Sequence, residues 1–108
     1  IEHIYARNRN EKENSLSDAR NVESLGNKAL LEKRINIRAS DYRFADKKKY
    51  YEGFTNSKGQ VKEKTGVVEL LDLTDGLTDF AEKDIIDRYK NMIACFINYL
   101  QQNNLLKQ

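Results

Sequence analysis

Four side chains in the first third of the chain have types that could do chemistry together. Glu2 and His3 are adjacent, and Asn27 and Asn36 follow nine positions apart. Histidine can take up a proton near neutral pH, because its ordinary pKa is about 6.5. Carboxylate and amide oxygens suit Mg²⁺, which takes few protein ligands and keeps several waters. A base, a hard cation and its ligands are what metal-assisted phosphodiester hydrolysis needs.

The elements that must position these residues are short. Residues 1–5 are predicted to be the end of a strand, and residues 22–31 a second short strand or turn in which Gly26 gives the backbone freedom before Asn27. A helix over about 31–38 would carry Asn36. Successive strand residues point to opposite faces, so Glu2 and His3 can face one site only if the strand bends.

The rest of the chain reads as loops and helices. Residues 6–21 are polar and are predicted to be a loop, and Ser40-Asp41 predicts the N-cap of a helix through about residue 51. Residues 56–59 predict a turn, and residues 60–65 a mobile loop. Residues 67–73 fit a strand or a helix, because periodicity cannot separate the two at this length.

The last segment predicts a long amphipathic helix capped by Thr78 or Asp79. Its apolar residues recur at spacings of three and four, which is the period of one helix face. They are Ile85, Ile86, Tyr89, Ile93, Phe96, Ile97 and Leu100. Cys95 is expected to be buried in this helix, and Arg88 to pair with an acid or pack its stem along it.

Length and composition bound the protein class. A chain of 108 residues is predicted to form a single domain, residues 1–108, and its first residue, Ile1, suggests a fragment of a larger protein. No apolar run is long enough to span a bilayer. The single cysteine excludes an intramolecular disulfide and a cysteine-built zinc site, so a reduced, cytoplasmic setting is expected.

The modest net charge of +2 hides an asymmetry between the two parts of the chain. Residues 1–66 carry 15 basic and 10 acidic residues, whereas residues 67–108 carry 4 and 7. The basic part contains the candidate chemical residues. A basic surface suits a polyanionic substrate, because each neutralised phosphate releases counterions.

The ordered pattern resembles the HNH (ββα-metal) nucleases, in the version found as the C-terminal domain of GmrSD-type, modification-dependent restriction endonucleases. Ile1-Glu2-His3-Ile4 is similar to the opening motif of that family, and Leu25-Gly26-Asn27, Leu30-Leu31 and Asn36 to its central pattern. Two later series complete the resemblance. They are Phe44 with Lys47 or Lys48 and Tyr50 or Tyr51, and then Phe80, Ile85 and Arg88. The chain departs from the family at Ala6, where proline is usual, and at Arg7.

The resemblance implies a role for each matched residue. His3 would be the general base and Asn27 would brace the loop between the strands, while Glu2 and Asn36 would bind one Mg²⁺ or Mn²⁺. It also implies DNA as the substrate and an N-terminal NTPase-like domain or subunit as a partner. Basic residues near the motif in sequence are predicted phosphate contacts. They are Arg34, Arg38, Lys47 and Lys48.

The sequence therefore predicts an α+β fold, with a small ββα-metal unit elaborated by helices and a long C-terminal helix. The predicted function is a metal-dependent DNA endonuclease domain of a modification-dependent restriction or phage-defence protein. Two alternatives stay open at this point. One is an HNH-like DNA-binding module without activity, and the other is a helical protein-interaction domain.

Overall fold

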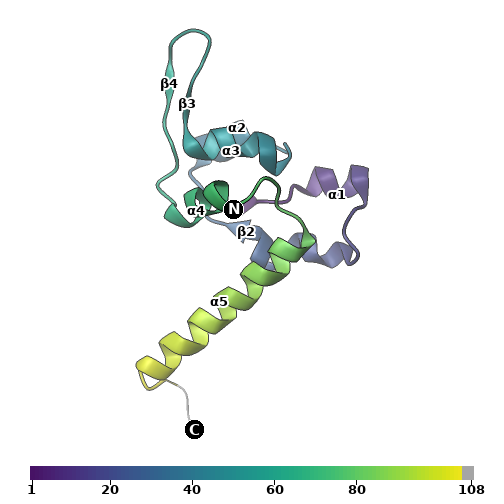
Figure 1. Cartoon of the computed structure of the whole chain (residues 1–108), viewed down its shortest axis with the longest axis vertical. Coiled ribbons are helices and arrows are strands. Elements are labelled where there is room, and N and C mark those ends of the chain that lie inside the picture. The colour runs from purple at the N-terminus through teal and green to yellow at the C-terminus, as the bar shows by residue number, and fades with distance from the viewer. Residues whose placement is uncertain (106–108) are drawn as a thin grey trace.

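The computed structural model describes residues 1–105 and shows helices combined with short strands (Figure 1). The α-helices are α1 (Arg7–Glu13), α2 (Lys33–Ala39), α3 (Phe44–Glu52), α4 (Val68–Gly76) and α5 (Glu82–Gln102). The strands are β1 (Glu2–His3), β2 (Lys28–Ala29), β3 (Phe54–Thr55) and β4 (Val61–Lys62), and two 3₁₀ helices are η1 (Ala19–Glu23) and η2 (Leu25–Asn27). This mixture agrees with the predicted α+β class.

The strands form two antiparallel pairs. In the first, Glu2 of β1 lies opposite Ala29 of β2, and His3 lies opposite Lys28. Helix α2 begins at Lys33, soon after β2 ends, whereas α1 and both 3₁₀ helices lie between β1 and β2. In the second, β3 and β4 form a hairpin that extends from the end of α3 (Figure 1).

The core lies where β1 leaves its sheet and meets α3, α4 and the start of α5. Its large, fully buried apolar side chains come from elements that are distant in sequence. They are Ile4, Tyr5, Phe44, Tyr51, Leu70, Phe80 and Ile85. Burial of each such side chain contributes about 1.5–3 kcal/mol to the free energy of folding. The cluster therefore holds the segment after β1 against α3, α4 and the start of α5.

Helix α5 packs against η2 at a point where only glycine fits. A Cβ on Gly26 would lie 2.0 Å from the carbonyl oxygen of Ile85 and 3.0 Å from Cβ of Tyr89. The absence of a side chain therefore lets the loop before β2 touch the backbone of α5.

Arg88 joins the same two elements by hydrogen bonds. Its Nη1 donates to the carbonyl oxygens of Leu25, Gly26 and Lys28, at 3.1, 3.0 and 2.8 Å. Its Nε and Nη2 donate to the carboxylate of Glu69 on α4, at 2.9 and 2.7 Å. The structural role predicted for Arg88 is confirmed by these contacts.

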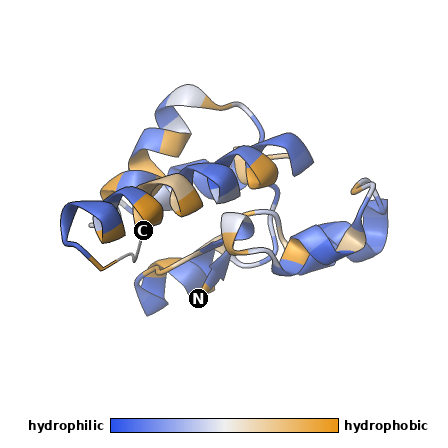
Figure 2. Cartoon of the chain, turned by 90° about the horizontal axis from the view of Figure 1, so that it is seen from below, coloured by the Kyte–Doolittle hydropathy of each residue, from blue (hydrophilic) through white to orange (hydrophobic). Residues whose placement is uncertain are grey.

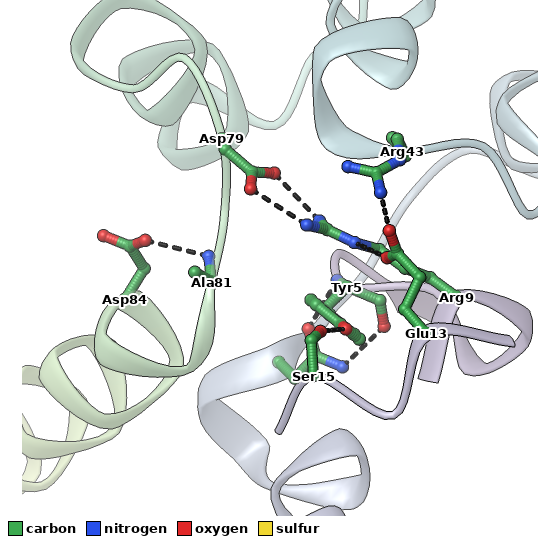
Figure 3. Close-up of polar contacts among 9 residues, drawn as sticks. Tyr5, Arg9, Glu13, Ser15, Arg43, Asp79, Ala81 and Asp84 are labelled. Atoms are coloured by element: carbon green, nitrogen blue, oxygen red, sulfur yellow. Dashed lines mark hydrogen bonds and ion pairs between the residues drawn. The ribbon is translucent and has the colours of Figure 1, made fainter. Parts of the chain in front are cut away.

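The prediction of a loop over residues 6–21 is wrong, because this segment contains α1 and part of η1. A side-chain contact across the fold holds α1 in place: Arg9 donates to both carboxylate oxygens of Asp79, at 2.8 and 2.9 Å (Figure 3). The guanidinium of Arg9 also lies over the ring of Tyr5, 4.4 Å from its centroid. Such contacts stabilise a short polar helix whose sequence alone predicts little order.

Helix α5 begins at Glu82 with Ala81 at its N-cap position, later than the predicted caps Thr78 and Asp79. The carboxylate of Asp84 instead accepts a hydrogen bond from the backbone N–H of Ala81 at 2.9 Å (Figure 3). Helix α3 likewise begins at Phe44 with Arg43 at its N-cap position, and not at a cap formed by Ser40-Asp41.

The structure of α4, of β4 and around Cys95 decides three further predictions. Residues 68–76 form a helix, which decides between the two alternatives for 67–73. Residues 61–62 form β4, where a mobile loop was predicted. Cys95 is exposed, so its predicted burial is wrong: the second half of α5 leaves the body of the domain (Figure 1). Within residues 1–105, no helix has both the length and the apolar character to cross a membrane.

The contact at Gly26 gives a stability prediction. Gly26→Ala should lower the free energy of unfolding by about 2 kcal/mol or more, because its Cβ overlaps the backbone of α5. Gly76→Ala is a matched control, since nothing lies within 4 Å of its Cβ and alanine favours a helix. Urea unfolding followed by circular dichroism measures both. Equal effects of the two changes would contradict this account.

Glu82 gives a pH prediction. Its carboxylate accepts hydrogen bonds from Oγ and N–H of Ser17, N–H of Asp18 and the Asn21 amide, and these lower the Glu82 pKa from 4.5 to about 2. A carboxyl with a folded pKa below its unfolded value stabilises the protein above pH 4.5 and loses this effect as the pH falls toward 2. Glu82→Gln should therefore be less stable than wild type at pH 7, with a smaller difference at pH 3. Glu11→Gln, at an exposed position of α1, should be nearly neutral at pH 7.

Candidate active site

Strand β1 places its two chemical residues in different surroundings. Glu2 is buried, with 3% of its surface exposed, whereas His3 is half-buried. This difference follows from the alternation of side chains along a strand. The two residues still line one small hollow, because the chain ends its strand at His3 and turns away from the sheet at once.

The carboxylate of Glu2 is fixed by two residues of α3. Oε2 accepts hydrogen bonds from Nζ of Lys47 at 2.9 Å and from the hydroxyl of Tyr51 at 2.6 Å. Lys47 and Tyr51 lie four residues apart, so they share one helix face. Lys47 is 1% exposed and also donates to the backbone oxygen of His3 at 3.1 Å. The ammonium thus holds both residues of β1.

Tyr51 acts as a donor in this cluster. Its burial, followed by the charge of Glu2 and the hydrogen bond to it, raises the pKa of the Tyr51 phenol above its ordinary value. The hydroxyl therefore stays protonated at neutral pH and donates a hydrogen bond to the carboxylate. Both hydrogen bonds to Oε2 come from residues of α3, so Oε1 is left for another partner.

His3 contacts a carboxylate on the other side. Its Nε2 lies 3.3 Å from Oε2 of Glu23, at the end of η1. Arg7 and Lys28 approach the same carboxylate, with nitrogen–oxygen distances of 2.7 and 3.2 Å. The hydrogen bond from Arg7, then that from His3, lowers the pKa of Glu23 to about 2. An ionised Glu23 can accept a hydrogen bond from Nε2–H of a neutral imidazole, in which Nδ1 then carries the lone pair.

Asn27 braces the chain that follows His3. It is fully buried, and its Oδ1 accepts from N–H of Tyr5 at 2.6 Å. Its Nδ2 donates to the carbonyl oxygens of Tyr5 and Val22, each at 2.9 Å. The backbone oxygen of Asn27 also accepts from N–H of Ile4 at 2.9 Å. These bonds fix the exit of β1 against the loop before β2.

The hollow itself gathers three of the four predicted chemical residues. Its volume is about 190 Å³. Glu2, His3 and Asn36 line it, together with Ile1, Ala6, Arg7, Ser40, Asp41 and Lys47. Asn36 reaches it from α2 and donates from Nδ2 to the backbone oxygen of Ile1 at 3.3 Å. Asn27 is not among the lining residues, so it can act on the site only through the backbone.

The donors in this hollow fit a hard cation that keeps most of its water. Oε1 of Glu2 and Oδ1 of Asn36 are oxygens of the kind that Mg²⁺ accepts, and this ion is commonly bound through one or two carboxylates. Within residues 1–105 no group of three or more His, Cys, Asp or Glu side chains could hold a metal. The ammonium of Lys47 already offsets the charge of Glu2, so the affinity of such a site would be modest.

The predicted phosphate contacts divide into two groups. Arg34 and Arg38 line a second hollow of about 260 Å³ beside α2, with Lys62 and Lys64 from the segment around β4. Glu32 and Glu63 also line it, so cations are in excess.

The other two predicted contacts have partners within the domain. Lys47 is buried and binds Glu2, so its ammonium is not accessible to a phosphate and the predicted phosphate contact is wrong. Lys48 donates from Nζ to the carbonyl oxygen of Leu77 at 2.8 Å, a bond it would have to give up to reach DNA.

Sequence reasoning missed the residues that support this site. They are Glu23, Asp41 and the pair formed by Lys47 and Tyr51 as partners of Glu2. The spacing of four between Lys47 and Tyr51 was a usable signal, since it puts a cation and a hydroxyl on one helix face. Nothing in the sequence indicated which carboxylate they would bind.

The sequence of this chain is that of a domain related to restriction endonucleases. Residues 1–95 match the family described as GmrSD restriction endonucleases, C-terminal domain, and the chain belongs to this family. No curated protein and no solved structure gives a significant match. The family supports a nuclease-related domain, and the geometry above adds the residues that could act.

The buried ion pair gives a prediction for this site. Lys47→Met should destabilise the domain by about 3–5 kcal/mol, because it leaves the Glu2 carboxylate buried without its cation. Urea unfolding is the measurement. Lys49→Met, at an exposed position of the same helix, is the matched control and should cost under about 1 kcal/mol.

A double variant tests the cause. Glu2→Gln combined with Lys47→Met removes both charges and should recover at least half of the loss, because no charge is then buried alone. Additive losses from the two changes would show that Lys47 acts by packing and not through Glu2.

Proposed function

We propose that this chain is a metal-dependent DNA endonuclease domain of a modification-dependent restriction or phage-defence protein. One observation carries the proposal. Glu2, His3 and Asn36 come from β1 and α2, yet they line a single hollow in a domain that belongs to a restriction endonuclease family. In this proposal β1, β2 and α2 form the ββα-metal unit.

Each residue has a task in the proposed hydrolysis. His3 accepts a proton from the water whose oxygen attacks phosphorus, while the bond from phosphorus to the leaving oxygen breaks. Glu23 orients the imidazole through Nε2, and Asn27 fixes the backbone that carries it. Glu2 and Asn36 would hold one Mg²⁺ or Mn²⁺, which supplies positive charge to the phosphate oxygens when bound.

The proposed DNA path runs along α2. Arg34 and Arg38 contact phosphates there, and their hollow contains an excess of positive charge. The domain acts in the cytoplasm, next to an N-terminal NTPase-like domain or subunit that selects the DNA. Mg²⁺ and Mn²⁺ have the same hard-donor chemistry at this site, so both belong in the test.

Plasmid nicking tests this proposal. The chain should convert supercoiled plasmid to the nicked form with Mg²⁺ or Mn²⁺, and EDTA should stop the reaction. His3→Ala should lower the rate at least a hundredfold, as expected for loss of a general base. The conversion is followed by gel electrophoresis over time.

Two comparisons make the nicking result decisive. Lys83→Ala, at an exposed position of α5 away from the hollow, should cleave like wild type. Circular dichroism and urea unfolding show whether His3→Ala is folded. Equal cleavage by wild type and folded His3→Ala, or no cleavage with either metal, would contradict the catalytic assignment. Salt-sensitive DNA binding without cleavage would identify a binding module instead.

A further inference from the structure

The second half of α5 presents an apolar surface that the domain does not cover. The C-terminal turns of the helix project from the body of the domain (Figure 1). Hydrophobic residues remain on its exposed turns next to the C-terminus (Figure 2). The exposed apolar residues of this helix are Ile86, Tyr89, Ile93, Phe96, Ile97 and Tyr99, and 58% of Phe96 is accessible to solvent.

Four of these residues, with the half-buried Leu100, form a stripe that has the spacing of a helix–helix seam. Ile86, Tyr89, Ile93, Phe96 and Leu100 are separated by three, four, three and four positions. This is the a/d pattern by which one helix packs its side chains between those of another. The family match covers residues 1–95, so the outer turns of the stripe lie beyond the matched residues.

The lack of charged residues along the outer part of the stripe limits which partner can cover it. A third of the chain is charged, yet no Lys, Arg, Asp or Glu occurs between Lys90 and Lys107. A charged partner would gain no ion pair there and would lose the hydration of its own charges. An identical uncharged helix meets neither penalty, because two copies place apolar residues opposite apolar residues.

Geometry favours an antiparallel arrangement of two such helices. Packed helix axes lie about 8–10 Å apart, whereas the chain measures 59 × 32 × 23 Å. In an antiparallel pair the two bodies lie at opposite ends, so only the helices need to touch. A parallel pair would bring both bodies to the same end, where η2 already packs against α5.

We propose that the free part of α5 pairs with the same helix of a second copy, antiparallel and centred between Phe96 and Ile97. On the four exposed residues of the stripe, the fraction accessible to solvent runs from 37% for Ile93 to 58% for Phe96. With about 150–250 Å² for a whole aromatic side chain, the five residues of the stripe therefore offer roughly 500 Å² per copy at most. Two copies would then bury about 1,000 Å², the lower end for a specific interface, so a dissociation constant in roughly the micromolar range is expected. The inference does not depend on the cleavage chemistry.

Sedimentation of the full chain from about 1 to 300 µM tests the pairing, since this range brackets micromolar dissociation constants. Wild type should pass from monomer to dimer. Ile93→Glu should weaken the dimer at least tenfold, because it puts a charge into the seam. Asn98→Glu adds the same charge on the opposite side of the helix and should dimerise like wild type. A monomeric wild type over the whole range, or equal weakening by both variants, would overturn the proposal.

Cross-linking tests the direction. In a Cys95→Ser background, Ile93→Cys and Leu100→Cys proteins are mixed and oxidised. The antiparallel pairing places position 93 opposite position 100, so the mixed disulfide should predominate over the two homodimers. Predominance of homodimers would refute the antiparallel arrangement. Circular dichroism confirms that each variant keeps its helix content.

Discussion

The ion pair between Glu2 and Lys47 fixes the position on which the rest of the site depends. It is buried, and it joins a two-residue strand to α3. A strand this short makes few backbone hydrogen bonds of its own, so side-chain contacts must hold it in place. Because Lys47 also binds the backbone oxygen of His3, one ammonium holds both the carboxylate of Glu2 and the backbone of its neighbour. Tyr51 completes the set by donating to the same oxygen of Glu2.

In the proposed site Glu2 has two roles with opposite requirements, to stabilise the fold and to bind a metal ion. A carboxylate that stabilises the fold needs its cation close by, whereas a metal ligand needs oxygen lone pairs free. The structure divides the two demands between the two oxygens, since both donors from α3 end on Oε2. His3 shows a similar division, because Glu23 occupies one ring nitrogen and the other stays free. The charge that stabilises the site and the groups that would react are thus on different atoms of the same side chains.

The sequence predicted the features that depend on spacing or on local chemistry. The long period-3.6 pattern of α5 was clear, and Gly26-Asn27 was recognisable as a special turn. The sequence could not predict contacts between distant residues. One such contact holds α1 in place, because Arg9 binds Asp79, seventy positions away. Lys47 looked like a surface lysine for the same reason, since only the fold reveals Glu2 beside it. Cys95 seemed buried because an amphipathic pattern does not tell whether a partner is present.

Two neighbouring residues connect the long helix to the candidate site. Gly26 touches the backbone of α5 at Ile85, and Asn27, the next residue, holds the backbone that follows His3. Because Gly26 and Asn27 share a peptide bond, the packing of α5 and the hydrogen bonds that hold Ile4 and Tyr5 rest on the same short loop. This loop is therefore a common support for the long helix and for the backbone that leaves β1.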